Sequence, residues 1–157
     1  MNSYSTSTFG ISRAILPAGL LAGALDITAA IVVYGYLGAK PIPLLQGIAA
    51  GVLGTRSFSG GLATALLGLF FQFLIATSAA AVYVLASRSI PFLINSPLVT
   101  GPLYGIAVYF FMSRIVVPLS AARKYPFTVR GMVIGVIIHI FCIGLPIALV
   151  TNRYARK

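Results

Sequence analysis

Four long apolar segments constrain the fold of this 157-residue chain more than any other feature of its sequence. They cover residues 14–37, 61–86, 98–119 and 127–150, and each holds at most one charged side chain. At about 1.5 Å per residue, a helix of any of these lengths crosses the roughly 30 Å hydrocarbon core of a bilayer. The sequence therefore predicts an all-α, polytopic membrane four-helix bundle that forms a single transmembrane domain over residues 1–157.

Composition supports a lipid environment and narrows the classes of function. Only 8% of the residues are charged, against about a quarter in soluble domains. The formal net charge is +10, but the Lys and Arg residues lie between the apolar segments, where they contact lipid headgroups. They do not form the aromatic-interleaved basic stripe of a nucleic-acid surface. We therefore expect the lipid bilayer as a partner and no nucleic acid.

The connection between the first two apolar segments predicts a short extra helix over residues 44–54. Two prolines precede it in "KPIPLLQGIAAGVLG", and a glycine- and serine-rich stretch follows it. A helix of this length reaches only about 16 Å and cannot span the membrane. It lies either at the interface, which we prefer as the simpler arrangement, or in a re-entrant position, where its broken backbone would need cover from protein or a wet cavity.

Four spans place both termini on the same side of the membrane, but the basic residues do not decide which side. The terminal side holds five of them: Arg13, Arg88, Arg153, Arg156 and Lys157. The opposite side holds six: Lys40, Arg56, Arg114, Arg123, Lys124 and Arg130. Because the counts are nearly balanced, the positive-inside rule favours neither orientation. We predict the bacterial cytoplasmic (inner) membrane, with the termini in the cytoplasm.

Pairs of glycines four residues apart recur along the chain and predict close helix packing. These pairs are Gly19 and Gly23, Gly47 and Gly51, Gly101 and Gly105, and Gly131 and Gly135. The first and third pairs lie near the starts of the first and third spans, so we expect those two spans to touch there. The chain also resembles a parallel duplication, because "GLFFQ" aligns with "GVIIH" and the first glycine pair aligns with the third.

Each span also places one hydrogen-bonding side chain near its centre, roughly a dozen residues from its start. These four side chains form a predicted polar layer at the bilayer midplane: Asp26, Gln72, Tyr109 and His139. A lone carboxyl at this depth costs several kcal/mol, so Asp26, the only acidic residue, should face the bundle interior with a partner or a proton. Besides the other three, candidate partners are Thr28 and two cations that otherwise anchor the interface, Arg56 and Arg114.

The residues predict no catalytic site, metal site or cofactor. One acidic residue excludes paired carboxylates, and phosphate loops and nucleophile elbows are absent. Asp26, His139 and Cys142 are too few and too scattered for a zinc site, which needs three or four ligands. Haem ligation by His139 lacks an evident second axial ligand. We therefore do not expect an enzyme.

Several stretches resemble a widespread family of uncharacterised small bacterial integral membrane proteins with four helices. The resemblance rests on "AGLLAGALDITAA", "LLQGIAAGVLG", "ALLGLFFQFLIA", "LYGIAVYFFMSRIVVPLSA" and "IGLPIAL", and it covers nearly the whole chain. In that family the position of Gln72 is often histidine, so this chain departs from a site built on two histidines. The resemblance implies an architecture and a location but no reaction.

Two functions of different classes remain open. The first, which we prefer, is a structural or accessory subunit whose glycine-rich helix faces pack in a homo-oligomer or in a larger membrane protein complex. The second is a small oligomeric channel or transporter that conducts an ion or small solute past Asp26 and His139.

Overall fold

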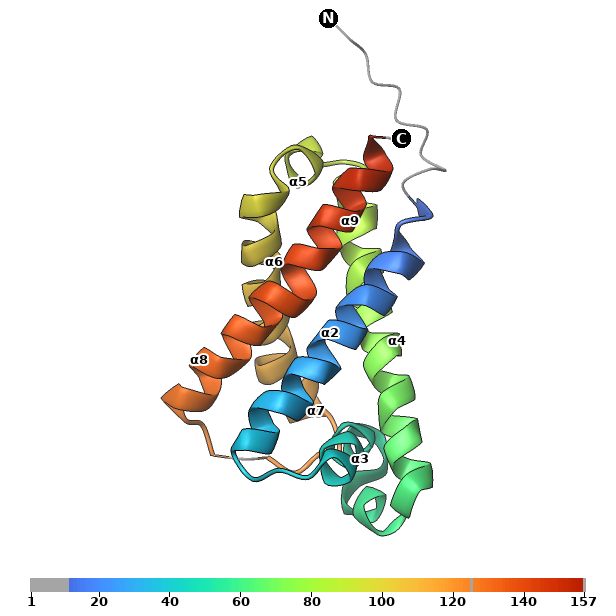
Figure 1. The fold of residues 1–157 in the computed structure, drawn as a ribbon, viewed down its shortest axis with the longest axis vertical. Coiled ribbons are helices and arrows are strands. Elements are labelled where there is room, and N and C mark those ends of the chain that lie inside the picture. Colours follow the sequence, from blue (N-terminus) through green and yellow to red (C-terminus); the bar gives the residue numbers. More distant parts are fainter. Residues whose placement is uncertain (1–11, 125, 157) are drawn as a thin grey trace, which may run out of the picture.

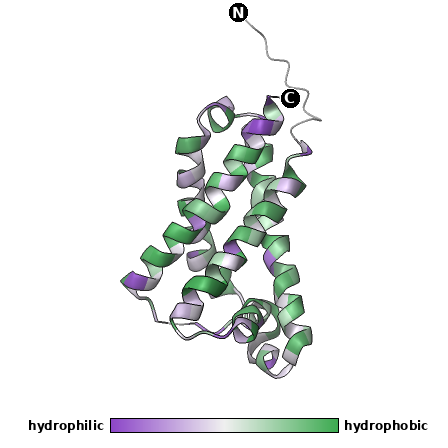
Figure 2. Cartoon of the chain, viewed as in Figure 1, coloured by the Kyte–Doolittle hydropathy of each residue, from purple (hydrophilic) through white to green (hydrophobic). Residues whose placement is uncertain are grey.

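The computed structural model describes residues 12–124 and 126–156, and these are helical with short connections and no strand. Four helical stretches in this part of the chain are long and apolar enough to cross a membrane, as predicted. They are α2 (Ile15–Tyr36), α4 (Gly61–Ser87), the stretch Pro97–Leu119, and the stretch Val129–Ala155. The last runs five residues past the predicted end at residue 150. Figure 2 shows apolar residues along most of the length of these helices.

The third and fourth stretches each contain a widened π-helical segment. The third consists of α6 (Pro97–Phe111), the π segment η2 (Met112–Val116) and α7 (Val117–Leu119). The fourth consists of α8 (Val129–Ile138), the π segment η3 (His139–Gly144) and α9 (Leu145–Ala155).

Two prolines explain these π segments. Pro118 follows η2 and Pro146 follows η3. A proline lacks the backbone N–H, and its ring collides with the carbonyl four residues earlier, which here lies inside the π segment in both cases. In the structure the turn before each proline is widened, and the third stretch ends at Leu119, one residue after Pro118.

The first hairpin is held by glycines of α2 against α4. A Cβ atom on Gly19 would lie 2.5 Å from the Cα of Thr77, and one on Gly23 would lie 2.8 Å from the ring of Phe73. The two backbones can approach this closely only because those positions carry no side chain.

The second hairpin is held in the same way by glycines of α6. A Cβ atom on Gly101 would lie 2.9 Å from the Cα of Leu145, and one on Gly105 would lie 2.7 Å from the Cα of Ile140. The predicted contact between the first and third spans is therefore wrong. Each glycine pair packs instead against the other helix of its own hairpin, because α2 and α6 lie on opposite sides of the last helix, which both of them contact.

The two hairpins meet around α9 at the end of the bundle where the described chain begins and ends (Figure 1). Their shared core is built from small side chains and one aromatic ring, among them Ala18 and Ala22 of α2, Ala80 and Tyr83 of α4, and Ile147. Tyr83 is only 1% exposed, and its hydroxyl lies 2.8 Å from the Leu93 carbonyl and 2.7 Å from Thr100 Oγ1. These bonds fix α5 (Pro91–Asn95), the short helix between α4 and α6.

The predicted short helix is present as α3 (Pro41–Leu53), followed by the 3₁₀ turn η1 (Gly54–Ser59). It lies at the opposite end of the bundle beside the start of α4, and the carbonyl of Leu45 occupies the space where Gly68 has no side chain (Figure 1). Gln46, which is 4% exposed, donates from Nε2 to the Gly61 carbonyl at 2.8 Å. The amide N–H of Ala121, in the connection that leaves α7, donates to the Gly51 carbonyl at 2.9 Å. Helix α3 is thus bonded to both hairpins.

Candidate functional site: a cavity between the hairpins

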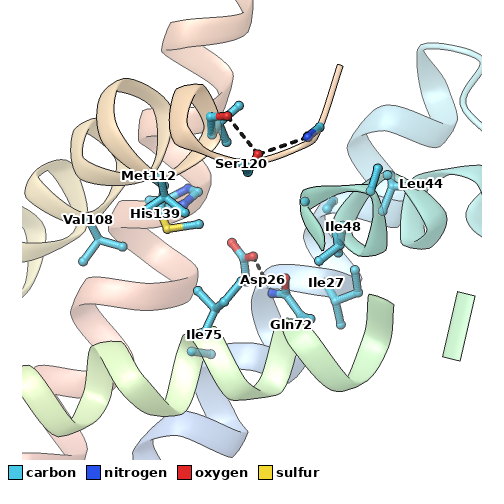
Figure 3. A pocket seen from close by; sticks show the side chains of 18 of the residues that line it. Asp26, Ile27, Leu44, Ile48, Gln72, Ile75, Val108, Met112, Ser120 and His139 are labelled. Atoms are coloured by element: carbon cyan, nitrogen blue, oxygen red, sulfur yellow. Dashed lines mark hydrogen bonds between the residues drawn. The ribbon is translucent and has the colours of Figure 1, made fainter. Parts of the chain in front are cut away.

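A cavity of about 470 Å³ lies between the two hairpins on the side of the bundle closed by α3. This is within the usual range for small-molecule sites, roughly 300–1,000 Å³. All four membrane-crossing stretches and α3 contribute to its wall, which is mostly apolar. Its aliphatic lining includes Ile27, Leu44, Ile48, Ile75, Val108 and Met112 (Figure 3).

Asp26 brings the one carboxyl of the chain into this apolar wall. Gln72, on α4, donates from Nε2 to Asp26 Oδ2 at 2.7 Å. The other oxygen, Oδ1, is buried and accepts no hydrogen bond from the described residues. A carboxylate offers about four acceptor positions, so a single amide donor leaves most of them unused. Figure 3 shows the carboxyl directed from α2 into the space between the labelled side chains.

His139 lines the same cavity from the second hairpin. Its Nδ1 lies 2.9 Å from the Gly135 carbonyl. A carbonyl only accepts, so Nδ1 is the donor, and a neutral ring then carries an acceptor at Nε2. No hydrogen bond joins His139 to Asp26 among the described residues; the two groups share the cavity.

Tyr109 takes a different position from the other three members of the predicted polar layer. Its ring packs edge-on against His139, with centroids 5.4 Å apart and planes at 78°. It also occupies the space beside Gly135. Tyr109 does not line the cavity, and its contact with the site is this packing against the His139 imidazole.

The two arginines proposed as partners of Asp26 lie elsewhere. Arg56 is exposed on η1. Arg114 is exposed on η2, with its guanidinium 5.2 Å from the centre of the Phe127 ring. Within residues 12–124 and 126–156 neither forms a salt bridge with Asp26, so pairing through either arginine is wrong for this structure. Both sit near the end of the bundle, where interface anchoring remains a prediction.

The glycine pairs have different surroundings. Gly19, Gly23, Gly101 and Gly105 form the helix contacts described above, and Gly135 faces Tyr109. Gly131 meets only the Thr128 hydroxyl that caps its own helix. Gly47 and Gly51 line the cavity, and a Cβ atom on Gly47 would have no atom within 4 Å.

The faint duplication in the sequence reappears as a pairing of cavity residues. Continuing the alignment of the glycine motifs pairs each of five residues in the first hairpin with a residue of the second. All ten line the cavity: Asp26 with Val108, Ala30 with Met112, Tyr34 with Val116, Gln72 with His139, and Ala76 with Ile143. The cavity therefore lies between the two hairpins, and one aligned pair, Gln72 and His139, places a polar side chain from each hairpin on its wall.

Residues of α3 and of the connection after α7 complete the wall. The sequence did not predict a site at these residues. They include Leu44 and Ile48 on α3, and Ser120 and Arg123 in the connection. One feature of the sequence could have indicated this part of the wall. Gly47 lies in a helix too short to span the membrane, and a residue without a side chain leaves space beside such a helix.

The described residues contain no group of three or more His, Cys, Asp or Glu side chains placed to hold a metal ion. Cys142 is a free, partly buried thiol.

No protein-family model matches the chain, and no curated protein or solved structure matches it. Membership of the resembled bacterial family therefore remains a prediction.

Proposed function

We propose that this protein is a small membrane transporter that takes a solute into the cavity between its two hairpins. The observation that carries the proposal is the Asp26 carboxyl, which lies in an apolar cavity of ligand size with one oxygen unbonded to the described residues. A carboxyl inside a membrane is costly and often marks a transport path. The π segments support the same site, because Met112 and Val116 of η2 and His139 and Ile143 of η3 line it, and π segments are frequent at functional sites.

The alternative of an accessory subunit rested on glycine faces available to partner helices. Five of those eight glycines, Gly19, Gly23, Gly101, Gly105 and Gly135, pack inside the chain, so these five leave no flat face for a partner. That function remains a prediction, and gentle purification from native membranes tests it: fixed stoichiometry with a larger assembly supports it, and a lone monomeric chain contradicts it.

We place the protein in the bacterial cytoplasmic membrane, with α3 at the interface and the termini in the cytoplasm. The packing of α3 against the end of the bundle supports the interfacial position. Reporter fusions at the C-terminus test the orientation, and signal from a reporter active only outside the cytoplasm would reverse it.

Solute flux in proteoliposomes tests the transporter proposal, with a cavity-filling variant as the critical comparison. In Gly47→Leu the new side chain enters open cavity space. In the control, Gly35→Leu, the new side chain also meets open space, but outside this cavity. We expect flux of at least one member of a panel of small amines, polyols and carboxylates above that of protein-free liposomes. This flux should be lost in Gly47→Leu and kept in Gly35→Leu. Equal flux through both variants would contradict the proposal.

A further inference from the structure

We infer that the cavity selects a lipophilic organic amine, bound with its ammonium group against Asp26 and its apolar body against the surrounding aliphatic wall. This rests on the proposed solute site and names the class of ligand that the site takes.

The charge requirement comes from Asp26. No cation forms a salt bridge with this carboxyl among the described residues, and its only hydrogen bond comes from the neutral amide of Gln72. A carboxylate in an apolar site is costly unless it is paired and hydrogen-bonded. An alcohol supplies a hydrogen bond but no charge. An amine supplies both, and because it brings its own proton, the pair it forms with the carboxyl is neutral overall.

The wall of the cavity excludes a bare metal ion and favours an apolar body. Alkaline-earth ions take six or more oxygen ligands, while the described residues give this site one carboxyl, the Gln72 amide and the His139 ring. The remaining polar side chains of the wall are Tyr34, Ser120 and Arg123, and the other contacts are aliphatic apart from the Phe58 ring. The cavity holds about the volume of 15 water molecules, enough for a compact hydrocarbon cage or a short chain.

The orientation of the bound amine follows from the positions of the charged groups in the cavity wall. Arg123 belongs to the wall in the connection after α7, which is bonded to α3, whereas Asp26 and Gln72 lie near the middle of α2 and α4. Its charge disfavours an ammonium group at that end. The amine therefore lies at the Asp26 end, and the apolar body extends toward α3.

Three probes with one hydrocarbon body separate these contributions: 1-adamantylamine, 1-adamantanol and 1-adamantanecarboxylate. Binding is measured by calorimetry on the full chain in lipid nanodiscs, with empty nanodiscs subtracted for partitioning. We expect the amine to bind at least tenfold more tightly than the alcohol, and the carboxylate not to bind. Asp26→Asn should weaken amine binding at least tenfold and leave the alcohol unchanged. Gly47→Leu should weaken both, and Gly35→Leu neither.

The comparison of the three probes on the unmodified chain needs no variant, so the inference can fail even if Asp26→Asn does not fold. Alcohol binding as tight as amine binding would overturn the amine inference, since the apolar body alone would then drive binding, as a lipid chain would. If that binding is still lost in Gly47→Leu, the solute cavity stands without its amine selectivity. If none of the three probes binds, the amine inference fails, and the flux assay then decides the transporter proposal separately.

Discussion

Gln72 Nε2 and Asp26 Oδ2 lie 2.7 Å apart across the α2–α4 interface, which makes an amide of the second span the hydrogen-bond donor to the only carboxyl of the chain. The bond lies about one turn beyond the glycine contact at Gly23, so the first hairpin is joined by close backbone packing and then by a polar pair. This pair keeps the carboxyl on the wall of the cavity, and its energetics can be measured directly.

We expect Gln72→Leu to lower the free energy of unfolding by about 1–3 kcal/mol, because it leaves a carboxyl buried without its donor. The double variant Asp26→Leu, Gln72→Leu should recover most of that loss, since replacing both partners by apolar groups is nearly neutral. Unfolding in mixed micelles, followed by circular dichroism, measures both. A double variant less stable than the single one would show that the pair is not coupled in this way.

Gly19→Ala should destabilise the first hairpin by about 1–3 kcal/mol, as overpacking does elsewhere. The added methyl group would lie 2.5 Å from the Cα of Thr77, and backbone cannot move aside cheaply. Gly35→Ala is the matched control on the same helix, where a Cβ atom meets nothing within 4 Å. Equal thermal midpoints for the two variants in the same detergent would contradict the close approach of α2 and α4.

Gln46→Leu should release α3 from α4 while leaving the four long helices folded. The change removes the 2.8 Å bond to the Gly61 carbonyl and the 3.3 Å bond to Thr64 Oγ1. We expect a loss of about 1 kcal/mol and faster hydrogen exchange confined to the amides of residues 41–53. Exchange that rises equally in the long helices would mean that α3 is not a separately docked element.

Tyr83→Phe should cost about 1–2 kcal/mol in the free energy of unfolding. The buried hydroxyl bonds the Leu93 carbonyl and Thr100, and without it the Leu93 carbonyl keeps only the longer 3.3 Å bond from Thr100. Tyr36→Phe provides the control, because Tyr36 is 90% exposed at the end of α2. Equal stability of the two variants would argue against a structural role for the Tyr83 hydroxyl.

The number and limits of the long helices could be predicted from the sequence because lipid imposes a simple length requirement on apolar segments. The predicted first span, 14–37, and the observed α2, Ile15–Tyr36, differ by one residue at each end. The fourth span was predicted to end at residue 150, and the observed helix continues to Ala155. In the structure Asn152 continues the helix and donates to the Ile94 carbonyl at 2.6 Å.

The neighbours of each helix could not be predicted from glycine spacing. A glycine pair shows that a backbone approaches closely but not which one, so Gly19 and Gly101 were wrongly assigned to each other. The cavity could not be predicted either, because it depends on α3 closing one end and on how the two hairpins are arranged. What the sequence did indicate was the depth of Asp26, Gln72 and His139, because depth follows from position along a helix of known rise.

The bond from Ala121 to Gly51 has a mechanical consequence. Helix α3 belongs to the first hairpin by sequence and by its seat on Gly68, yet its far end is bonded to the connection that leads out of the third span. At that end the wall of the cavity is therefore a helix that is attached to both hairpins. Any motion that spreads the hairpins apart there must break this backbone bond or carry α3 along, so the cavity cannot open at that end without changing the attachment of α3.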